Sequence, residues 1–148
     1  MARNRFDYTF DSDTALKDVS AGIASSAPAQ VASADRILDL GAGRIEGVVV
    51  IDVTALDVAA GDEGTIFFQV SDGGPGTTAF EAGSWITAAA LVLGDVTLNG
   101  SKTDSAVGHY ELFCTNEING VVYRYARLYT LVASSGQLTY TAFLATQH

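Results

Sequence analysis

The stretch that decides the fold lies between Gly108 and Leu144 and reads GHYELFCTNEINGVVYRYARLYTLVASSGQLTYTAFL. Segments rich in Tyr, Phe, Val, Leu and Thr are separated there by Asn119-Gly120 and by Ser134-Ser135-Gly136. An Asn-Gly pair between such segments is a strong hairpin signal, because both residues accept the positive φ of a type I′ turn. We therefore predict an antiparallel β-meander in this part of the chain.

The strand pattern also extends upstream of this stretch. Residues 65–71 place Ile66, Phe68 and Val70 on one face, an alternation typical of a half-buried strand. Further strands are expected over residues 37–40, 45–56 and 85–93, although the alanines at 88–90 also have helical propensity. The glycine-rich segments 59–64 and 72–76 and the pair Asn99-Gly100 are expected to form turns or loops.

About eight short strands with turns at roughly ten-residue spacing predict an all-β sandwich or barrel. Connections of Greek-key length favour a single-domain jelly-roll β-sandwich with antiparallel strands, and a fibronectin- or immunoglobulin-like sandwich is the alternative topology. We predict the jelly-roll domain over residues 35–148, preceded by an extended N-terminal arm and connection over residues 1–34.

The arm carries its own strand pattern. Phe6, Tyr8 and Phe10 alternate with polar residues over 5–11, whereas residues 12–34 have little periodicity and are expected to be irregular. An extended apolar strand on such a tether can complete the sheet of a neighbouring molecule. The alternative is an edge strand of the same sandwich.

Composition limits the classes of partner. The 148 residues are 48% hydrophobic and 17% charged, so one packed domain is expected. A net charge of −9 disfavours nucleic acid as a partner, because that affinity depends on cationic side chains. The charge suits a basic protein surface, or it maintains solubility alone. We expect no secretory signal and no membrane span, since every apolar stretch is short.

The residue types that catalysis requires are scarce. The histidines are His109 and His148, too few for the metal site of a cupin, and a Ser–His–Asp site would depend on His109 alone. The single cysteine, Cys114, excludes an internal disulfide and is expected to be a small buried apolar residue. Most carboxylates fall in predicted loops, and the acidic segment 11–18 lacks the glycine and glutamate of a calcium loop. We therefore predict no enzyme activity and no bound metal.

One short motif suggests a cofactor. The sequence ILDLGAG at residues 37–43 is similar to motif I of the S-adenosylmethionine-dependent methyltransferases. That motif requires a helix after its glycine-rich turn, but strand residues resume here at Ile45. We therefore expect a turn between antiparallel strands and no cofactor.

An aromatic and cationic face is predicted on residues 121–132. Alternation places Arg127 on one face with Tyr123, Tyr125 and Tyr129, and it places Arg124 on the other face. Tyrosine and arginine are enriched at interaction hot spots, but the same residues also serve as cross-strand packing. A carbohydrate-binding face is the third possibility, which Trp85 and Tyr140 could join.

Several blocks in order resemble the jelly-roll cement proteins that decorate the heads of tailed bacteriophages, the family first recognised in a short-tailed phage. The blocks are RILDLGAGR at residues 36–44, GVVVIDVTA at 47–55, GHYELF at 108–113, TNE at 115–117, NG at 119–120, YRYARLY at 123–129 and YTAF at 140–143. The resemblance runs from about residue 36 onward, and residues 1–35 match loosely.

The resemblance implies a structural virion protein that is made in the host cytoplasm and binds the outer capsid surface. It would cement neighbouring major capsid protein subunits and associate with itself as a dimer or trimer. We nominate Phe6, Tyr8 and Phe10 for strand addition, and Arg124, Tyr125 and Arg127 for a self-association or shell-binding face. A carbohydrate-binding module on a virion or cell surface is the alternative function.

Overall fold

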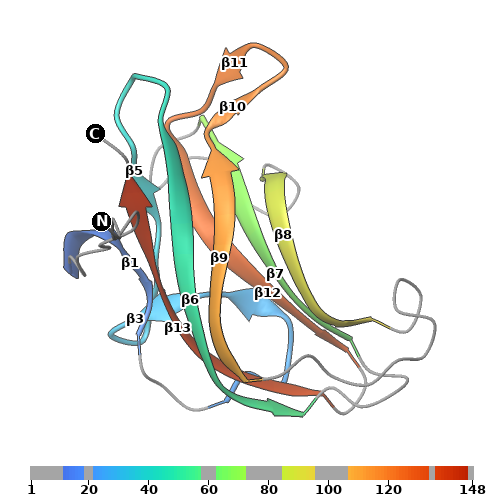
Figure 1. The fold of residues 1–148 in the computed structure, drawn as a ribbon. Helices are drawn as coiled ribbons and strands as arrows, with labels where there is room; N and C mark the ends of the chain where they lie inside the picture. The colour runs from blue at the N-terminus through green and yellow to red at the C-terminus, as the bar shows by residue number, and fades with distance from the viewer. Residues whose placement is uncertain are drawn as a thin grey trace, which may run out of the picture.

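The computed structural model describes residues 12–18, 22–57, 63–72, 85–95, 107–133 and 136–146. This part of the chain is all-β, with one short 3-10 turn, η1 (Ser12–Thr14), and no α-helix. Two antiparallel sheets lie face to face (Figure 1). The predicted strand over 5–11 and the predicted turns at 99–100 and 134–135 lie outside the described residues.

The first sheet has four strands in the order β1-β13-β6-β9. Its strands are β1 (Ala15–Lys17), β13 (Gln137–Thr146), β6 (Glu46–Asp57) and β9 (Gly108–Thr115). The predicted strand over 45–56 is confirmed by β6, which forms antiparallel ladders with β13 on one side and β9 on the other. No helix follows the ILDLGAG motif: the chain bends at Ala42 and Gly43, and β6 begins at Glu46.

The second sheet has five strands. Its main order is β2-β12-β7-β8, and β5 also pairs with β12. The strands are β2 (Ala27–Pro28), β12 (Tyr125–Ala133), β7 (Glu63–Ser71), β8 (Ile86–Asp95) and β5 (Leu38–Asp39). The strand predicted over 85–93 is therefore confirmed, because β-pairing with β7 prevails over the helical propensity of the alanines.

Alternating side chains from both sheets form one apolar core. Ile66, Phe68 and Val70 of β7 are all fully buried, which confirms the predicted inner face of this strand. Ile51 on β6 and Leu128 on β12 are buried in the same cluster. Full burial of each such side chain contributes roughly 1.5–3 kcal/mol, so this layer holds the two sheets together.

A buried polar contact also joins the sheets. Tyr140 on β13 is fully buried, and its hydroxyl lies 2.7 Å from Thr130 Oγ1 on β12. The prediction that Tyr140 could join an exposed aromatic face is therefore wrong. The strand alternation points its ring into the core, and Thr130 satisfies its hydroxyl there.

Two small hairpins accompany the sheets: β3 (Gln30–Val31) with β4 (Ala34–Asp35), and β10 (Glu117–Ile118) with β11 (Val121–Val122). The second hairpin projects beyond the sheets (Figure 1). Its turn residues Asn119 and Gly120 have φ angles of 52° and 82°, which confirms the predicted tight turn with positive φ at both positions.

The side chain of Asn116 fixes the base of this hairpin. Its Oδ1 accepts from the Ile45 amide at 2.8 Å, and its Nδ2 donates to the carbonyls of Gly43 and Tyr123 at 3.0 and 2.9 Å. Because Asn116 is fully buried, these bonds replace water for three backbone groups. They join the segment before β6 to the segment that leads into β12.

Two expectations about local structure are wrong. The described residues between 12 and 34 are not an irregular connection, because β1 pairs with β13 and β2 pairs with β12. Leu16 and Ala29 lie in the core, and contacts of this kind are not visible in the local sequence pattern. The strand predicted over 121–132 is interrupted between β11 and β12, where the Tyr123 amide donates to the Asn116 carbonyl at 2.8 Å.

Replacing Asn116→Ala removes three hydrogen bonds of a fully buried side chain and leaves two partly buried backbone groups, the Ile45 amide and the Tyr123 carbonyl, without this partner. We expect a loss of about 3 kcal/mol in the free energy of unfolding, since each unsatisfied buried group costs about 1–3 kcal/mol. Urea denaturation measures this loss, with Gln137→Ala, at an exposed position, as the control. An unchanged midpoint for Asn116→Ala would contradict the role assigned to this side chain.

Candidate interaction surface

Arg127 is the centre of an aromatic cluster on the outer face of the second sheet. Its guanidinium carbon lies 4.4 Å from the centroid of the Trp85 ring and 5.3 Å from that of Tyr129. Its Nε donates to Gln69 Oε1 at 2.9 Å. Burial lowers the pKa of Arg127, with Tyr129 and Asp35 acting in the opposite direction. The cation is therefore held in one orientation by two rings and an amide.

Arg124 lies just before β12, and the Asp39 carboxylate of β5 holds its guanidinium in place. Its Nε and Nη2 donate to the two oxygens of Asp39 at 2.8 and 2.9 Å, in a two-bond arrangement suited to guanidinium and carboxylate. The guanidinium carbon also lies 5.5 Å from the centroid of the Tyr125 ring. Both charged side chains are about half exposed, so the pair is accessible to a partner.

Asp39 has a strongly shifted acidity. Hydrogen bonds from Arg124 and from the Gly41 amide lower its pKa from the usual 3.8 to about 2. Both bonds favour the ionised carboxylate. The Asp39 carboxylate is therefore ionised at neutral pH, with the Arg124 guanidinium bound to it.

Three of the six nominated residues, Arg124, Tyr125 and Arg127, lie in the described part of the chain, in or next to β12. Tyr125, Arg127 and Tyr129 alternate along one face of β12, while Ala126 and Leu128 on the other face are fully buried. This arrangement agrees with the prediction that Arg127 shares one face of the strand with Tyr125 and Tyr129. Arg124 differs, because it precedes β12 and lies exposed with Asp39 instead of sharing the buried face.

The remaining nominated residues, Phe6, Tyr8 and Phe10, lie outside the described residues. Sequence reasoning included Trp85 as a possible member of the aromatic face, and Arg127 does stack on its ring. It missed Gln69 and Asp39, which the pairing of β7 and β5 with β12 places beside the two arginines. Identifying these two residues requires the register in which the strands pair.

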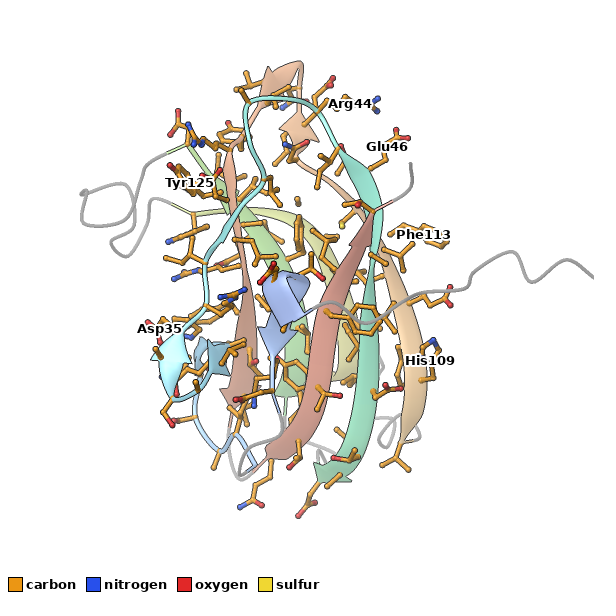
Figure 2. The ribbon with its side chains drawn as sticks, turned by 90° about the vertical axis from the view of Figure 1, so that its left-hand side faces the viewer. Asp35, Arg44, Glu46, His109, Phe113 and Tyr125 are labelled. Carbon is orange, nitrogen blue, oxygen red and sulfur yellow. The ribbon has the colours of Figure 1, made fainter. Side chains whose placement is uncertain are left out.

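A second polar cluster lies on the outer face of the first sheet. His109 Nδ1 lies 3.0 Å from Asp52 Oδ1, and His109 Nε2 lies 3.5 Å from Glu111 Oε1. The hydrogen bond to Asp52 is the main cause of a raised His109 pKa, with burial acting in the opposite direction. Figure 2 shows His109 and Phe113 on one side of the molecule and Asp35 and Tyr125 on the other.

The single cysteine lies in the apolar core. Cys114 is buried, as predicted, and burial raises the pKa of its thiol to about 12, so the reactive thiolate is disfavoured. Among the described residues, no group of three or more His, Cys, Asp or Glu side chains is placed to hold a metal ion. None of the helices in the described ranges is long and apolar enough to cross a membrane.

Comparisons with known protein families, with curated proteins and with solved structures find no match for this chain.

The Arg124–Asp39 pair predicts a specific response to acid. A carboxyl whose pKa is lower in the folded than in the unfolded state contributes stability that is present above about pH 4 and is lost as the pH falls toward about 2. In Arg124→Gln we therefore expect a smaller drop in Tm than in the wild type across this interval, measured by thermal scans.

Arg127→Gln is the matched control, because Arg127 hydrogen-bonds the neutral Gln69. Its drop in Tm over the same interval should match that of the wild type. An equal drop in Arg124→Gln and in the wild type would show that the pair does not set the acidity of Asp39.

Proposed function

We propose that the protein is a jelly-roll cement protein of a tailed-phage head, which binds the outer capsid surface and bridges neighbouring major capsid protein subunits. The ordered sequence blocks between residues 36 and 143 are the observation that carries this proposal, because they resemble that family in combination and in sequence order. The protein would act as a structural component without enzyme activity.

The strand order supports the jelly-roll part of the proposal. A jelly roll has eight main strands in two sheets and two Greek keys. Numbered one to eight, its strands take the orders 1-8-3-6 and 2-7-4-5. Here the main strands are β1, β2, β6, β7, β8, β9, β12 and β13, and the sheets β1-β13-β6-β9 and β2-β12-β7-β8 follow the same two orders.

The outer face of β12 supports a protein-binding role. Tyrosine, tryptophan and arginine are the side chains most enriched at interaction hot spots. The rings of Trp85 and Tyr129 hold Arg127 in place before any partner binds, so less conformational entropy is lost on association. Arg124 and Tyr125 continue this face toward β5.

A carbohydrate-binding module is the second candidate, since exposed aromatic rings can also stack on sugars. The Arg127 guanidinium occupies one face of the Trp85 ring, so a sugar would have to use the opposite face. Binding on a glycan array that is lost in Trp85→Ala would favour this candidate.

Arg127→Ala is expected to weaken shell binding. The substitution removes the cation and releases the two rings that hold it, and a hot-spot side chain contributes at least about 1–2 kcal/mol, or roughly a tenfold change in affinity. The measurement is co-sedimentation of the protein with heads that lack their own copy, taken from the phage whose genome encodes it. Thr54→Ala, at an exposed position on the other sheet, is the control. Equal saturation curves for Arg127→Ala and the wild type would remove this face from the proposed contact.

Replacing Phe6, Tyr8 and Phe10 together with serine tests the arm in the same assay. We expect lower occupancy at saturation with an unchanged circular dichroism spectrum, because the aromatics would add to a neighbouring sheet. Undiminished binding would exclude the arm from the contact with the shell.

A further inference from the structure

The two arginines of the β12 face differ in what their guanidinium groups bind. Arg124 donates from Nε and Nη2 to both oxygens of Asp39. Arg127 donates from Nε to the neutral Oε1 of Gln69 at 2.9 Å. Among the described residues, no carboxylate lies within salt-bridge distance of Arg127, and no acceptor lies within hydrogen-bond distance of its Nη1 or Nη2.

The geometry of Arg127 leaves one end of its guanidinium for a ligand. A guanidinium can form two parallel hydrogen bonds through Nε and one Nη, or through both Nη nitrogens. Arg124 uses the first arrangement with Asp39. In Arg127 the bond from Nε to Gln69 and the contacts with two aromatic rings hold the plane of the group. The two Nη nitrogens are therefore a preoriented pair of donors.

The charge of Arg127 is only partly compensated by its surroundings. The side chain is partly buried, and burial lowers its pKa more than Tyr129 and Asp35 raise it. For Arg124, in contrast, the hydrogen bonds to Asp39 raise the pKa. A partly desolvated cation without a bound carboxylate is stabilised by an anion that approaches its Nη nitrogens.

A carboxylate fits this pair of donors in shape and in charge. Its two oxygens accept two parallel N–H bonds, and its single negative charge balances that of one guanidinium. A phosphate group carries a charge of about −1.5 to −2 at neutral pH. The neighbouring cation, Arg124, is already bound to Asp39, so Arg127 alone would face that larger charge. The arrangement therefore favours a carboxylate over a phosphate.

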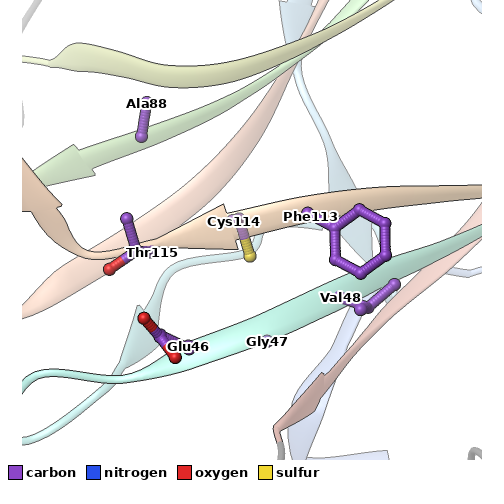
Figure 3. A pocket seen from close by; sticks show the side chains of 7 residues that line it. All are labelled: Glu46, Gly47, Val48, Ala88, Phe113, Cys114 and Thr115. Carbon is purple, nitrogen blue, oxygen red and sulfur yellow. The ribbon is translucent and has the colours of Figure 1, made fainter.

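The cavity lined by strands β6, β8 and β9 has the opposite character. It has a volume of about 360 Å³, and Val48, Phe113 and Cys114 contribute apolar walls. Glu46 is the one charged side chain among the described residues that line it (Figure 3). A carboxylate in this cavity would lie near a like charge, so the cavity does not compete with the β12 face for such a group.

We infer that the Nη1 and Nη2 groups of Arg127 bind a carboxylate side chain of a partner protein, beside the rings of Trp85 and Tyr129. This inference rests on the protein-binding role proposed above and names the chemical group that the surface recognises. Acidic side chains of the major capsid protein and of a second copy of this chain share that chemistry.

Nuclear magnetic resonance of the free, full-length protein tests the inference with acetate as the probe. Sodium acetate replaces sodium chloride at constant ionic strength and neutral pH. We expect saturable shifts of the Arg127 Nε–H resonance and of the indole N–H of Trp85, the single tryptophan. Arg124 is the internal control, and its resonance should stay in place because Asp39 occupies its two-bond side. In Arg127→Lys, which has no planar pair of donors, the Trp85 shift should fall several-fold.

An Arg127 resonance that stays in place, or that moves no more than that of Arg124, would overturn the inference. A larger saturable shift with inorganic phosphate than with acetate would overturn the assignment to a carboxylate. The assay uses no phage heads, so acetate binding by protein that fails to bind heads would contradict the cementing function and leave the inference in place. Normal binding to heads without an acetate shift would do the reverse.

Carbodiimide coupling distinguishes the two sources of the carboxylate. In Arg127→Lys, the reagent joins the introduced amine to a carboxylate in contact with it, and mass spectrometry identifies the joined peptides. A product between two copies in the free protein would assign the contact to self-association, and a product with the major capsid protein in the presence of heads would assign it to the shell. No product above that of Ala34→Lys, at an exposed position on β4, in either sample would overturn the assignment to a protein carboxylate.

Discussion

The burial of one apolar layer between two sheets is the constraint on which the rest of this structure depends. Ile51 and Tyr140 from the first sheet and Phe68 and Leu128 from the second are all fully buried in that layer. Because side chains alternate along a strand, this assignment of the inner face also decides which residues reach the outer face. Arg127, the tyrosines of β12 and the His109 cluster are outer-face residues for this reason.

The same layer explains how distant parts of the chain meet. The ladder between β13 and β6 pairs residues about 90 positions apart, such as Leu144 with Val49, and the Tyr140–Thr130 contact joins the two sheets within it.

The long strands could be predicted because their signals are local. Alternation predicted the inner face of β7, and Asn119-Gly120 predicted the turn between β10 and β11. Both signals depend on residues close in sequence. The two-residue strand β2 could not be predicted, because it is defined only by its pairing with β12. The strand expected over residues 37–40 is present as the two residues of β5 (Leu38–Asp39). The buried role of Asn116 was missed for a related reason, because two of the backbone groups that it binds lie some 70 residues away.

The candidate surface was predictable to a similar extent. Composition and alternation identified Tyr125 and Arg127 as neighbours on one outer face, but their partners depend on strand register. Gln69 lies beside Arg127 and Asp39 beside Tyr125 only because β7 and β5 pair with β12 in the observed registers. Because the strand is interrupted before β12, Arg124 does not follow the alternation of that strand and instead bonds to Asp39. Both arginines thus lie in defined positions, as a surface that binds without rearrangement requires.

Electron cryo-microscopy of phage heads incubated with an excess of the protein tests the central claim most directly. The account predicts density for an all-β domain of this size on the outer surface of the shell, in contact with at least two major capsid protein subunits. A bare outer shell in the presence of folded protein, or density on the inner surface, would contradict the cementing function.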